Sequence, residues 1–275
     1  MKKIYIFDSS VDFQKDIDFG VPTDVLPLRV YVDDKEYIDK VTITDEEFYK
    51  YCLSGAKVTT SQPKQEMIKE KLTKYSKEFD EVYVVTISQK LSGTYDTVQS
   101  IIENEKLKNV TLIDSKSGSV KTTYVLYRVI GAAENGVKVT QELADEFVRD
   151  SLLVFTVSSL EYLERGGRIG KAKALLGKLL RIKPILSTDE EGYTISLGME
   201  RTHEGCISKM KQLAEEFARK VSNPIVMGGY GVSEMKTYLD KLLQGFNVHS
   251  VARIGPAISA HVGPEVFGLV VGRGF

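Results

Sequence analysis

Hydroxyl side chains gather at two points where a β-rich run gives way to a polar segment. These segments are residues 59–63, TTSQP, and 88–95, SQKLSGTY, and we expect each to begin a helix, with Ser61 as the first N-cap. A helix N-terminus presents free backbone N–H groups and a positive dipole end, which favour an anion. Thr60 and Ser92 could therefore hold a carboxylate or a phosphate, although ordinary helix capping would explain the same residues.

A lone histidine offers a second kind of chemistry. His261 lies in the segment 254–264, IGPAISAHVGP, where two Gly-Pro turns bracket small and apolar residues. Such surroundings limit solvation and restrict the direction of the imidazole. The alternative is a core histidine that is hydrogen-bonded to the backbone.

Several partial matches to familiar catalytic motifs lack the residues that define those motifs. The Gly-Lys pairs at 170–171 and 177–178 lack the upstream glycine and the hydroxyl of a phosphate-binding loop. His203-Glu204 could open a zinc-binding HExxH, but Ile207 stands in place of the second histidine. Ser92 lacks the flanking glycines of a nucleophile elbow. We therefore expect no metal site, no cofactor, and neither an autonomous ATPase nor a serine hydrolase.

The elements that must position these residues follow an α/β pattern. Near-continuous apolar runs at 4–7, 82–87 and 110–113 alternate with helical patterns, which indicates a parallel sheet covered on both faces. Ligands of such sheets bind beyond the carboxyl ends of the strands, where the polar segments lie. From about residue 155 onward, the strand-like runs are joined by fewer helical crossovers. We therefore predict two domains, residues 1–154 and a smaller α/β domain at 155–275.

Composition bounds the function. The chain has 275 residues, 42% hydrophobic and 27% charged, with a formal net charge of -1, so no global basic field attracts nucleic acid. No apolar run approaches the roughly 20 residues that span a bilayer, and the run that ends at Phe7 is too short for an export signal. Cys52 and Cys206 form no disulfide framework. We expect a cytoplasmic protein.

A basic segment follows the glycine-rich turn Arg165-Gly166-Gly167-Arg168. Residues 170–183 place apolar side chains on one helical face and cations elsewhere, which predicts a basic amphipathic helix. Such a helix could make transient contact with an anionic membrane surface. A core-packed helix with a solvated face is the alternative. The apolar positions are Ala172, Leu175, Leu176 and Leu179, and the cations are Lys171, Lys178 and Arg181.

Taken together, the segments resemble those of the DegV family, in order over essentially the whole chain. The matching segments are FDSS at 7–10, TTSQP at 59–63, SQKLSGTY at 88–95, LEYLERGGRIGKAKALLG at 160–177, IKPIL at 182–186, Arg201-Thr202, and IGPAISAHVGP at 254–264. Two departures occur: Phe7 replaces a frequent small residue, and residues 119–121, SVK, differ from the usual small-residue run.

The resemblance implies a two-domain α/β fold, with a mixed sheet in the second domain and a long-chain fatty acid buried between the domains. It also implies similarity to the non-catalytic, fatty-acid-binding subunit of bacterial fatty acid kinase. A separate ATP-dependent subunit there forms the acyl phosphate used in phospholipid metabolism. By resemblance, Thr60, Ser92 and the Gly93 N–H contact the carboxylate, and Arg201 and His261 support them or assist phosphoryl transfer.

Two other functions stay open at this point. The chain could be an enzyme for a small polar substrate, related to dihydroxyacetone kinase, with a histidine at the substrate. It could also be a lipid sensor or transport protein without a kinase partner.

Overall fold

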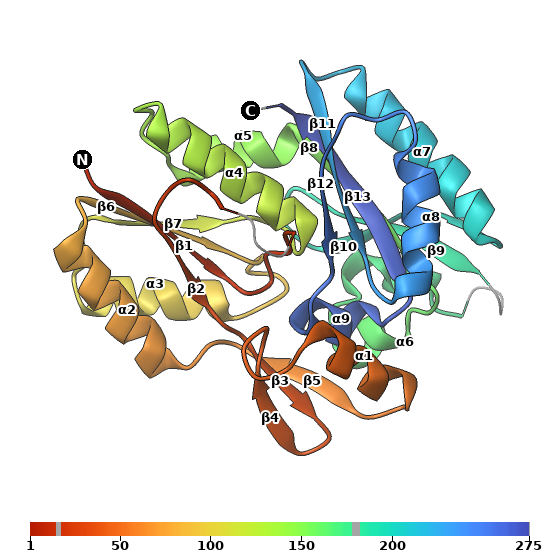
Figure 1. Cartoon of the computed structure of the whole chain (residues 1–275), viewed down its shortest axis with the longest axis horizontal. Coiled ribbons are helices and arrows are strands. Elements are labelled where there is room, and N and C mark those ends of the chain that lie inside the picture. Colours follow the sequence, from red (N-terminus) through yellow and green to blue (C-terminus); the bar gives the residue numbers. More distant parts are fainter. Residues whose placement is uncertain (15–17, 178–181, 275) are drawn as a thin grey trace.

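The computed structural model describes residues 1–14, 18–177 and 182–274, arranged as three sheets with flanking helices (Figure 1). The helices are α1 (Asp45–Leu53), α2 (Gln65–Glu78), α3 (Thr94–Asn104), α4 (Val120–Glu134), α5 (Gln141–Arg149), α6 (Glu161–Arg165), α7 (His203–Ala218), α8 (Ser233–Leu243) and α9 (Pro256–Val262). The strands are β1 (Lys3–Asp8), β2 (Thr23–Leu26), β3 (Arg29–Val32), β4 (Lys35–Ile38), β5 (Val58–Ser61), β6 (Glu81–Thr86), β7 (Val110–Asp114), β8 (Ser151–Val157), β9 (Lys183–Thr188), β10 (Thr194–Glu200), β11 (Pro224–Tyr230), β12 (Val248–Arg253) and β13 (Val266–Arg273).

The first sheet is parallel throughout, in the order β2-β1-β6-β7. Its central strands are apolar on both faces because helices cover both sides. Ile4 and Ile6 pack under α2 and α3, whereas Tyr5 and Phe7 pack under α4 and α5. The predicted parallel sheet with flanking helices is confirmed.

The second sheet is mixed, in the order β10-β9-β8-β13-β11-β12, with β11 and β12 as its parallel pair. Helices α7 and α8 cover one face and α4 packs on the other, so α4 lies between the two large sheets (Figure 1). The division predicted between residues 154 and 155 falls inside β8, every residue of which pairs with β13.

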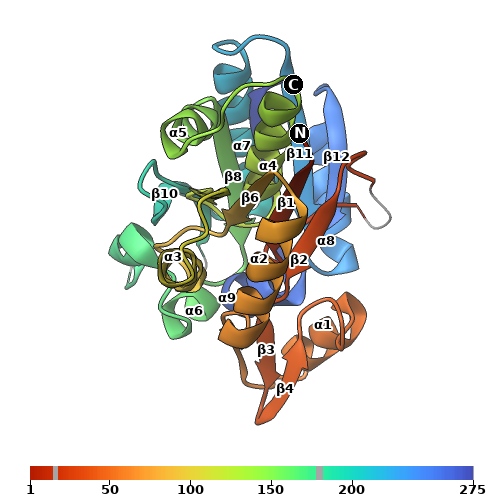
Figure 2. The ribbon, with the colours of Figure 1, turned by 90° about the vertical axis from the view of Figure 1, so that its left-hand side faces the viewer.

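A small antiparallel sheet, β4-β3-β5, was not expected from the sequence. It lies with α1 at one end of the molecule, below the parallel sheet in Figure 2. The expectation of a helix starting in 59–63 is wrong, because Val58–Ser61 pair with β3 and α2 begins only at Gln65. β-Branched residues at 58–60 suit a strand. Ser61 is not an N-cap; its hydroxyl accepts a hydrogen bond from Arg29 at 2.9 Å.

The basic segment is also not a regular α-helix where it is described. A 3₁₀ turn spans Gly170–Leu175, and positions 178–181 of the predicted helix lie outside the described residues. Ala172 is buried in a core that includes Leu163 and Leu186, and Leu175 is buried as well. The apolar side of this turn therefore packs against the protein, as in the core-packed alternative. In the part of the chain that the structure describes, no helix is both long and apolar enough to cross a bilayer.

Candidate functional site

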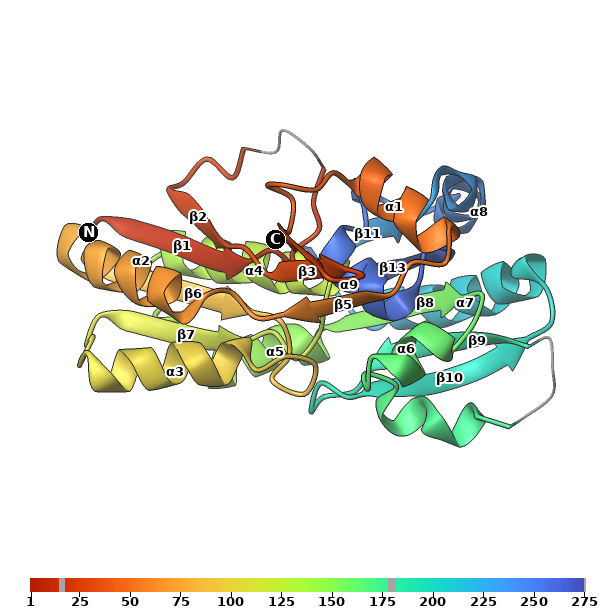
Figure 3. The ribbon, with the colours of Figure 1, turned by 90° about the horizontal axis from the view of Figure 1, so that it is seen from below.

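A cavity of about 370 Å³ lies where the carboxyl ends of β1 and β6 meet the six-stranded sheet. Figure 3 shows the parallel sheet and the six-stranded sheet side by side, and α9 packs against β3 and β5 of the small sheet. The cavity is bounded by Ile87 after β6, by residues of β8 and β13, and by α9. Its apolar wall includes Leu153, Phe155, Leu163, Ile258, Val262 and Val266. A site beyond the carboxyl ends of parallel strands was expected, and the volume falls in the usual range for small-molecule pockets.

Thr60 and His261 meet in this cavity although they are 201 residues apart in the sequence. The Thr60 hydroxyl lies 2.7 Å from Nε2 of His261. Pairing of β5 with β3 holds Thr60, and α9 carries His261. Nδ1 of His261 is buried and has no hydrogen-bond partner among the described residues. It lies against Gly166, where an added Cβ would collide with the ring.

Burial determines the charge of this histidine. Burial is the larger cause and the nearby positive charge of Arg168 the smaller one, and together they lower the pKa of His261 to about 4. The imidazole is therefore neutral near pH 7, with one ring nitrogen protonated. A neutral ring can exchange a hydrogen bond with Thr60 but brings no positive charge to the cavity.

Ser92 and Gly93 lie at the beginning of α3, as the sequence predicted. The Ser92 hydroxyl accepts a hydrogen bond from the backbone N–H of Thr94 at 3.3 Å and lies 2.9 Å from the Thr94 hydroxyl. Gly93 is the N-cap residue, and a Cβ there would lie 3.2 Å from the amide oxygen of Gln62. Both residues line the cavity, so the start of α3 faces it.

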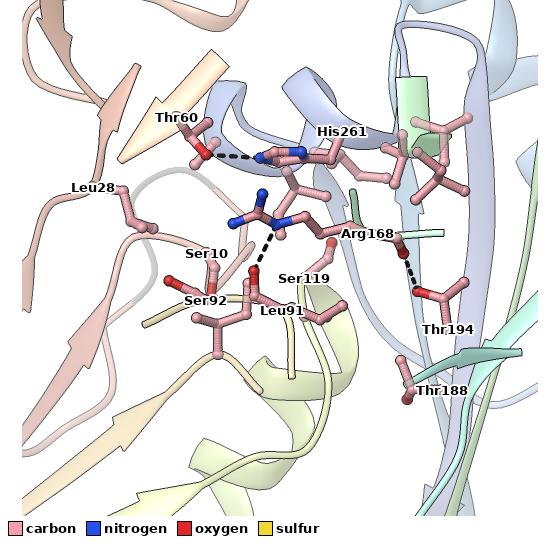
Figure 4. Close-up of a pocket in the computed structure, with 18 of the residues that line it drawn as sticks. Ser10, Leu28, Thr60, Leu91, Ser92, Ser119, Arg168, Thr188, Thr194 and His261 are labelled. Carbon is pink, nitrogen blue, oxygen red and sulfur yellow. Dashed lines mark hydrogen bonds between the residues drawn. The ribbon is translucent and has the colours of Figure 1, made fainter. Parts of the chain in front are cut away.

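Arg168 supplies the positive charge, and sequence reasoning assigned it no role. It follows α6 in the turn Arg165-Gly166-Gly167-Arg168, and its side chain extends between Thr60 and Ser92 (Figure 4). Nε donates to the Leu91 carbonyl at 2.9 Å, and Nη1 donates to the Gly166 carbonyl at 2.6 Å. An arginine in a glycine-rich turn was the available signal.

Arg201 is not part of this group. It is exposed, immediately after β10 and before Thr202, the N-cap of α7. The cavity touches the other end of β10, at Thr194, and seven residues of strand span roughly 20 Å. The expected contribution of Arg201 to a polar network around the carboxylate therefore has no counterpart in the cavity.

Within the described residues, no group of three or more His, Cys, Asp or Glu side chains is placed to hold a metal ion. The chemistry that the cavity offers is recognition of an anion by Arg168, by hydroxyls and by the start of α3, next to apolar walls.

Comparison with known proteins identifies the family. The family model described as "Uncharacterised protein, DegV family" matches residues 3–273. The chain belongs to the DegV family. A DegV domain-containing protein of Staphylococcus aureus is 33% identical over 282 residues, which cover 98% of each chain.

Two solved structures have the same fold. A DegV family protein from Thermus thermophilus, described by its fatty acid binding, has a TM-score of 0.90 and 28% identity, covering 99% of this chain and 100% of its own. A stearic-acid-binding protein from Eubacterium ventriosum has a TM-score of 0.85 and 27% identity, covering 99% and 98%. The resemblance to the DegV family and the α/β fold that it implied are confirmed.

Proposed function

We propose that this DegV protein binds a long-chain fatty acid, with its carboxylate at Thr60, Ser92 and the Gly93 N–H and its tail along the apolar wall. The observation that carries the proposal is one cavity that joins an arginine and two hydroxyl-bearing segments to an apolar wall. The fatty-acid and stearic-acid binding of the two relatives at 28% and 27% identity supports it.

Charge recognition falls to Arg168 rather than to the histidine. His261 is neutral near pH 7, so it orients Thr60, while the guanidinium balances the carboxylate. This assignment extends the sequence-based one, which gave the supporting role to Arg201 and His261.

The energetics suit a tightly held lipid. A sixteen-carbon chain has about fourteen methylenes, and burying them at roughly 0.8 kcal/mol each gives about 11 kcal/mol gross. Association and ordering cost roughly 4–15 kcal/mol. Hydrogen bonds to the charged head group, at roughly 1.5–3 kcal/mol each, offset its lost hydration. The tail provides affinity, and the polar groups orient the head.

We further propose that the protein is a non-catalytic, cytoplasmic subunit that presents the carboxylate to a separate kinase. The acyl phosphate formed there would enter phospholipid metabolism. Arg201 is then a surface residue for docking or phosphoryl transfer, and 170–183 is the segment that could touch a membrane. The absence of familiar phosphate-loop motifs from the sequence supports a separate kinase.

A small polar substrate is the less favoured function, because apolar side chains form much of the cavity wall. The decisive experiment is native mass spectrometry and lipid extraction of several independent preparations, followed by displacement of a fluorescent fatty acid. We expect retained fatty acid and competition by palmitate or oleate. Folded protein that is consistently empty and ignores both lipids would overturn the proposal. Lipid binding without acyl phosphate formation in the presence of candidate kinases would favour a sensor or transport protein.

A further inference from the structure

Helix α9 carries His261 into the cavity, but it is short and no local side chain caps its N-terminus. It has only seven residues, and its N-cap, Gly255, has no side chain that could cap it. Helices this short are not stable alone in water. Ala257 and Ile258 of the same helix also line the cavity, so the placement of α9 determines the cavity wall as well as the imidazole.

Two carboxylates from distant parts of the chain take the place of a local cap. Oδ1 of Asp12 accepts a hydrogen bond from the Gly255 N–H at 3.0 Å. Oδ1 of Asp39 accepts one from the Ala257 N–H at 3.3 Å. Both carboxylates are buried, with Asp39 fully inaccessible to solvent. Anionic groups at free N–H groups of a helix start stabilise that end.

Asp12 also connects α9 to the other cavity walls. Its Oδ1 pairs with Nζ of Lys40 at 2.7 Å, and its Oδ2 accepts a hydrogen bond from the Ser119 hydroxyl at 2.6 Å. Ser119 lines the cavity and has a φ of 55°, a strained value for a residue with a side chain. A strained residue persists only where its surroundings fix it.

Asp39 connects the start of α9 to the small sheet through Ser9. Its Oδ2 accepts a hydrogen bond from the Ser9 hydroxyl at 2.5 Å, and the same hydroxyl oxygen accepts one from the Leu28 N–H at 3.0 Å. Leu28 lines the cavity. The start of α9 is thus tied to the loop after β1 and to the residue that precedes β3.

We propose that Asp12 and Asp39 are positioning residues for the carboxylate site, which hold α9 so that His261 meets Thr60. The inference rests on the proposed fatty acid binding. It distinguishes these two residues from general contributors to folding, because the part of their effect that depends on the head group passes through one imidazole, whereas the part that passes through Ala257 and Ile258 acts alike on ligands with the same tail. Loss of either should weaken ligands that carry a carboxylate more than ligands with the same tail and a neutral head.

The experiment compares Kd values for palmitate and for hexadecanol in the full chain. For Asp39→Ala we expect palmitate binding to weaken roughly ten-fold, as for loss of a hydrogen bond to a charged group, with hexadecanol changed far less. Asp39→Asn keeps an oxygen for the Ala257 N–H and should recover much of the loss. In a His261→Ala background, Asp39→Ala should cause little further loss of palmitate affinity.

Asp24→Ala is the matched control. Asp24 accepts hydrogen bonds from Lys71 and Tyr75 beside β2, so its loss should lower stability without changing the ratio of the two Kd values. Equal weakening of both ligands by Asp39→Ala, or an undiminished effect without His261, would overturn the positioning role. If Asp39→Ala does not fold, the same ratio and the His261 NMR signals are measured in Asp12→Ala, which removes the acceptor of the Gly255 N–H; an unchanged ratio and unchanged signals would also overturn the positioning role. Wild-type protein that binds neither palmitate nor oleate would instead refute the proposed function.

Discussion

Arg168 and His261 are adjacent polar residues in the cavity, but their surroundings give them different charges. Burial and then Arg168 lower the pKa of His261 to about 4. The histidine should therefore stay neutral from pH 8 down to about pH 5, the range in which an exposed histidine titrates. In Arg168→Gln the second cause is gone, so the pKa of His261 should rise but remain below 6.5, because burial remains.

NMR titration of the imidazole in ligand-free protein measures both values. Arg168→Lys, which keeps a positive charge, is the control and should leave the pKa of His261 closer to that of the wild type. A histidine signal assigned to His261 that titrates near 6.5 in the wild type would contradict the structural account of a buried, neutral ring.

The two hydroxyls proposed at the carboxylate can be tested separately from their local roles. Thr60→Val keeps the shape of the side chain, and Ser92→Ala removes only the oxygen. Each should weaken fatty acid binding by roughly 1.5–3 kcal/mol, or about ten-fold or more, in displacement of a fluorescent fatty acid. Ser100→Ala, on the same α3 helix but away from the cavity lining, should leave affinity unchanged.

Ser92 needs one more measurement because it also bonds the Thr94 N–H at the start of α3. If Ser92→Ala lowers the melting temperature of ligand-free protein but leaves affinity intact, the hydroxyl serves only as a cap. Unchanged affinity in both hydroxyl variants would remove Thr60 and Ser92 from the binding site.

At the scale of elements, the 3₁₀ turn Gly170–Leu175 depends on close contact with β10. Gly170 has a φ of 52°, and a Cβ there would lie 2.7 Å from the Thr194 carbonyl oxygen. Gly170→Ala should therefore destabilise the protein by more than the ~1 kcal/mol typical of a left-handed glycine. Because Thr194 lines the cavity, it should also weaken fatty acid binding.

Gly136→Ala separates these two causes. Gly136 has a φ of 77°, but a Cβ there meets nothing within 4 Å. It should show the cost of backbone strain alone in denaturant unfolding, with normal lipid affinity. Equal unfolding free energies for the two variants would mean that the turn yields to the added methyl group without loss of packing.

The elements that sequence reasoning predicted well are those with a strong local pattern. The buried strands β1 and β6 were predicted from their apolar runs at 4–7 and 82–87. The four-residue strands of the small sheet were missed because a segment this short is fixed by its partners rather than by its own pattern. Thr60 lines the cavity, but it lies on a strand and not at the helix start that the sequence predicted.

The two arginines show a different limit. Arg168 and Arg201 each follow a recognisable segment, and although the glycine-rich turn marks Arg168 as a candidate, the local sequence does not say which arginine faces the cavity. That depends on the strand direction of β10 and on the turn after α6, which only the packed chain determines. Sequence patterns identify candidate residues, whereas tertiary packing decides which of them meet.

Over the whole molecule, the proposed carboxylate site and Arg201 are separated: one faces a cavity between sheets, and the other is on the surface at the start of α7. A kinase that phosphorylates the carboxylate must approach from outside, so an exposed cation is suited to docking rather than to holding the lipid.

Arg201→Ala should retain palmitate with wild-type affinity. It should lower acyl phosphate production in a reconstituted assay at limiting kinase, and excess kinase should restore the rate, as expected for weakened docking. Arg219→Ala removes another exposed arginine at the opposite end of α7 and should have no effect. Loss of bound lipid in Arg201→Ala would show that the residue acts on the site from a distance, and a wild-type rate at limiting kinase would exclude it from docking.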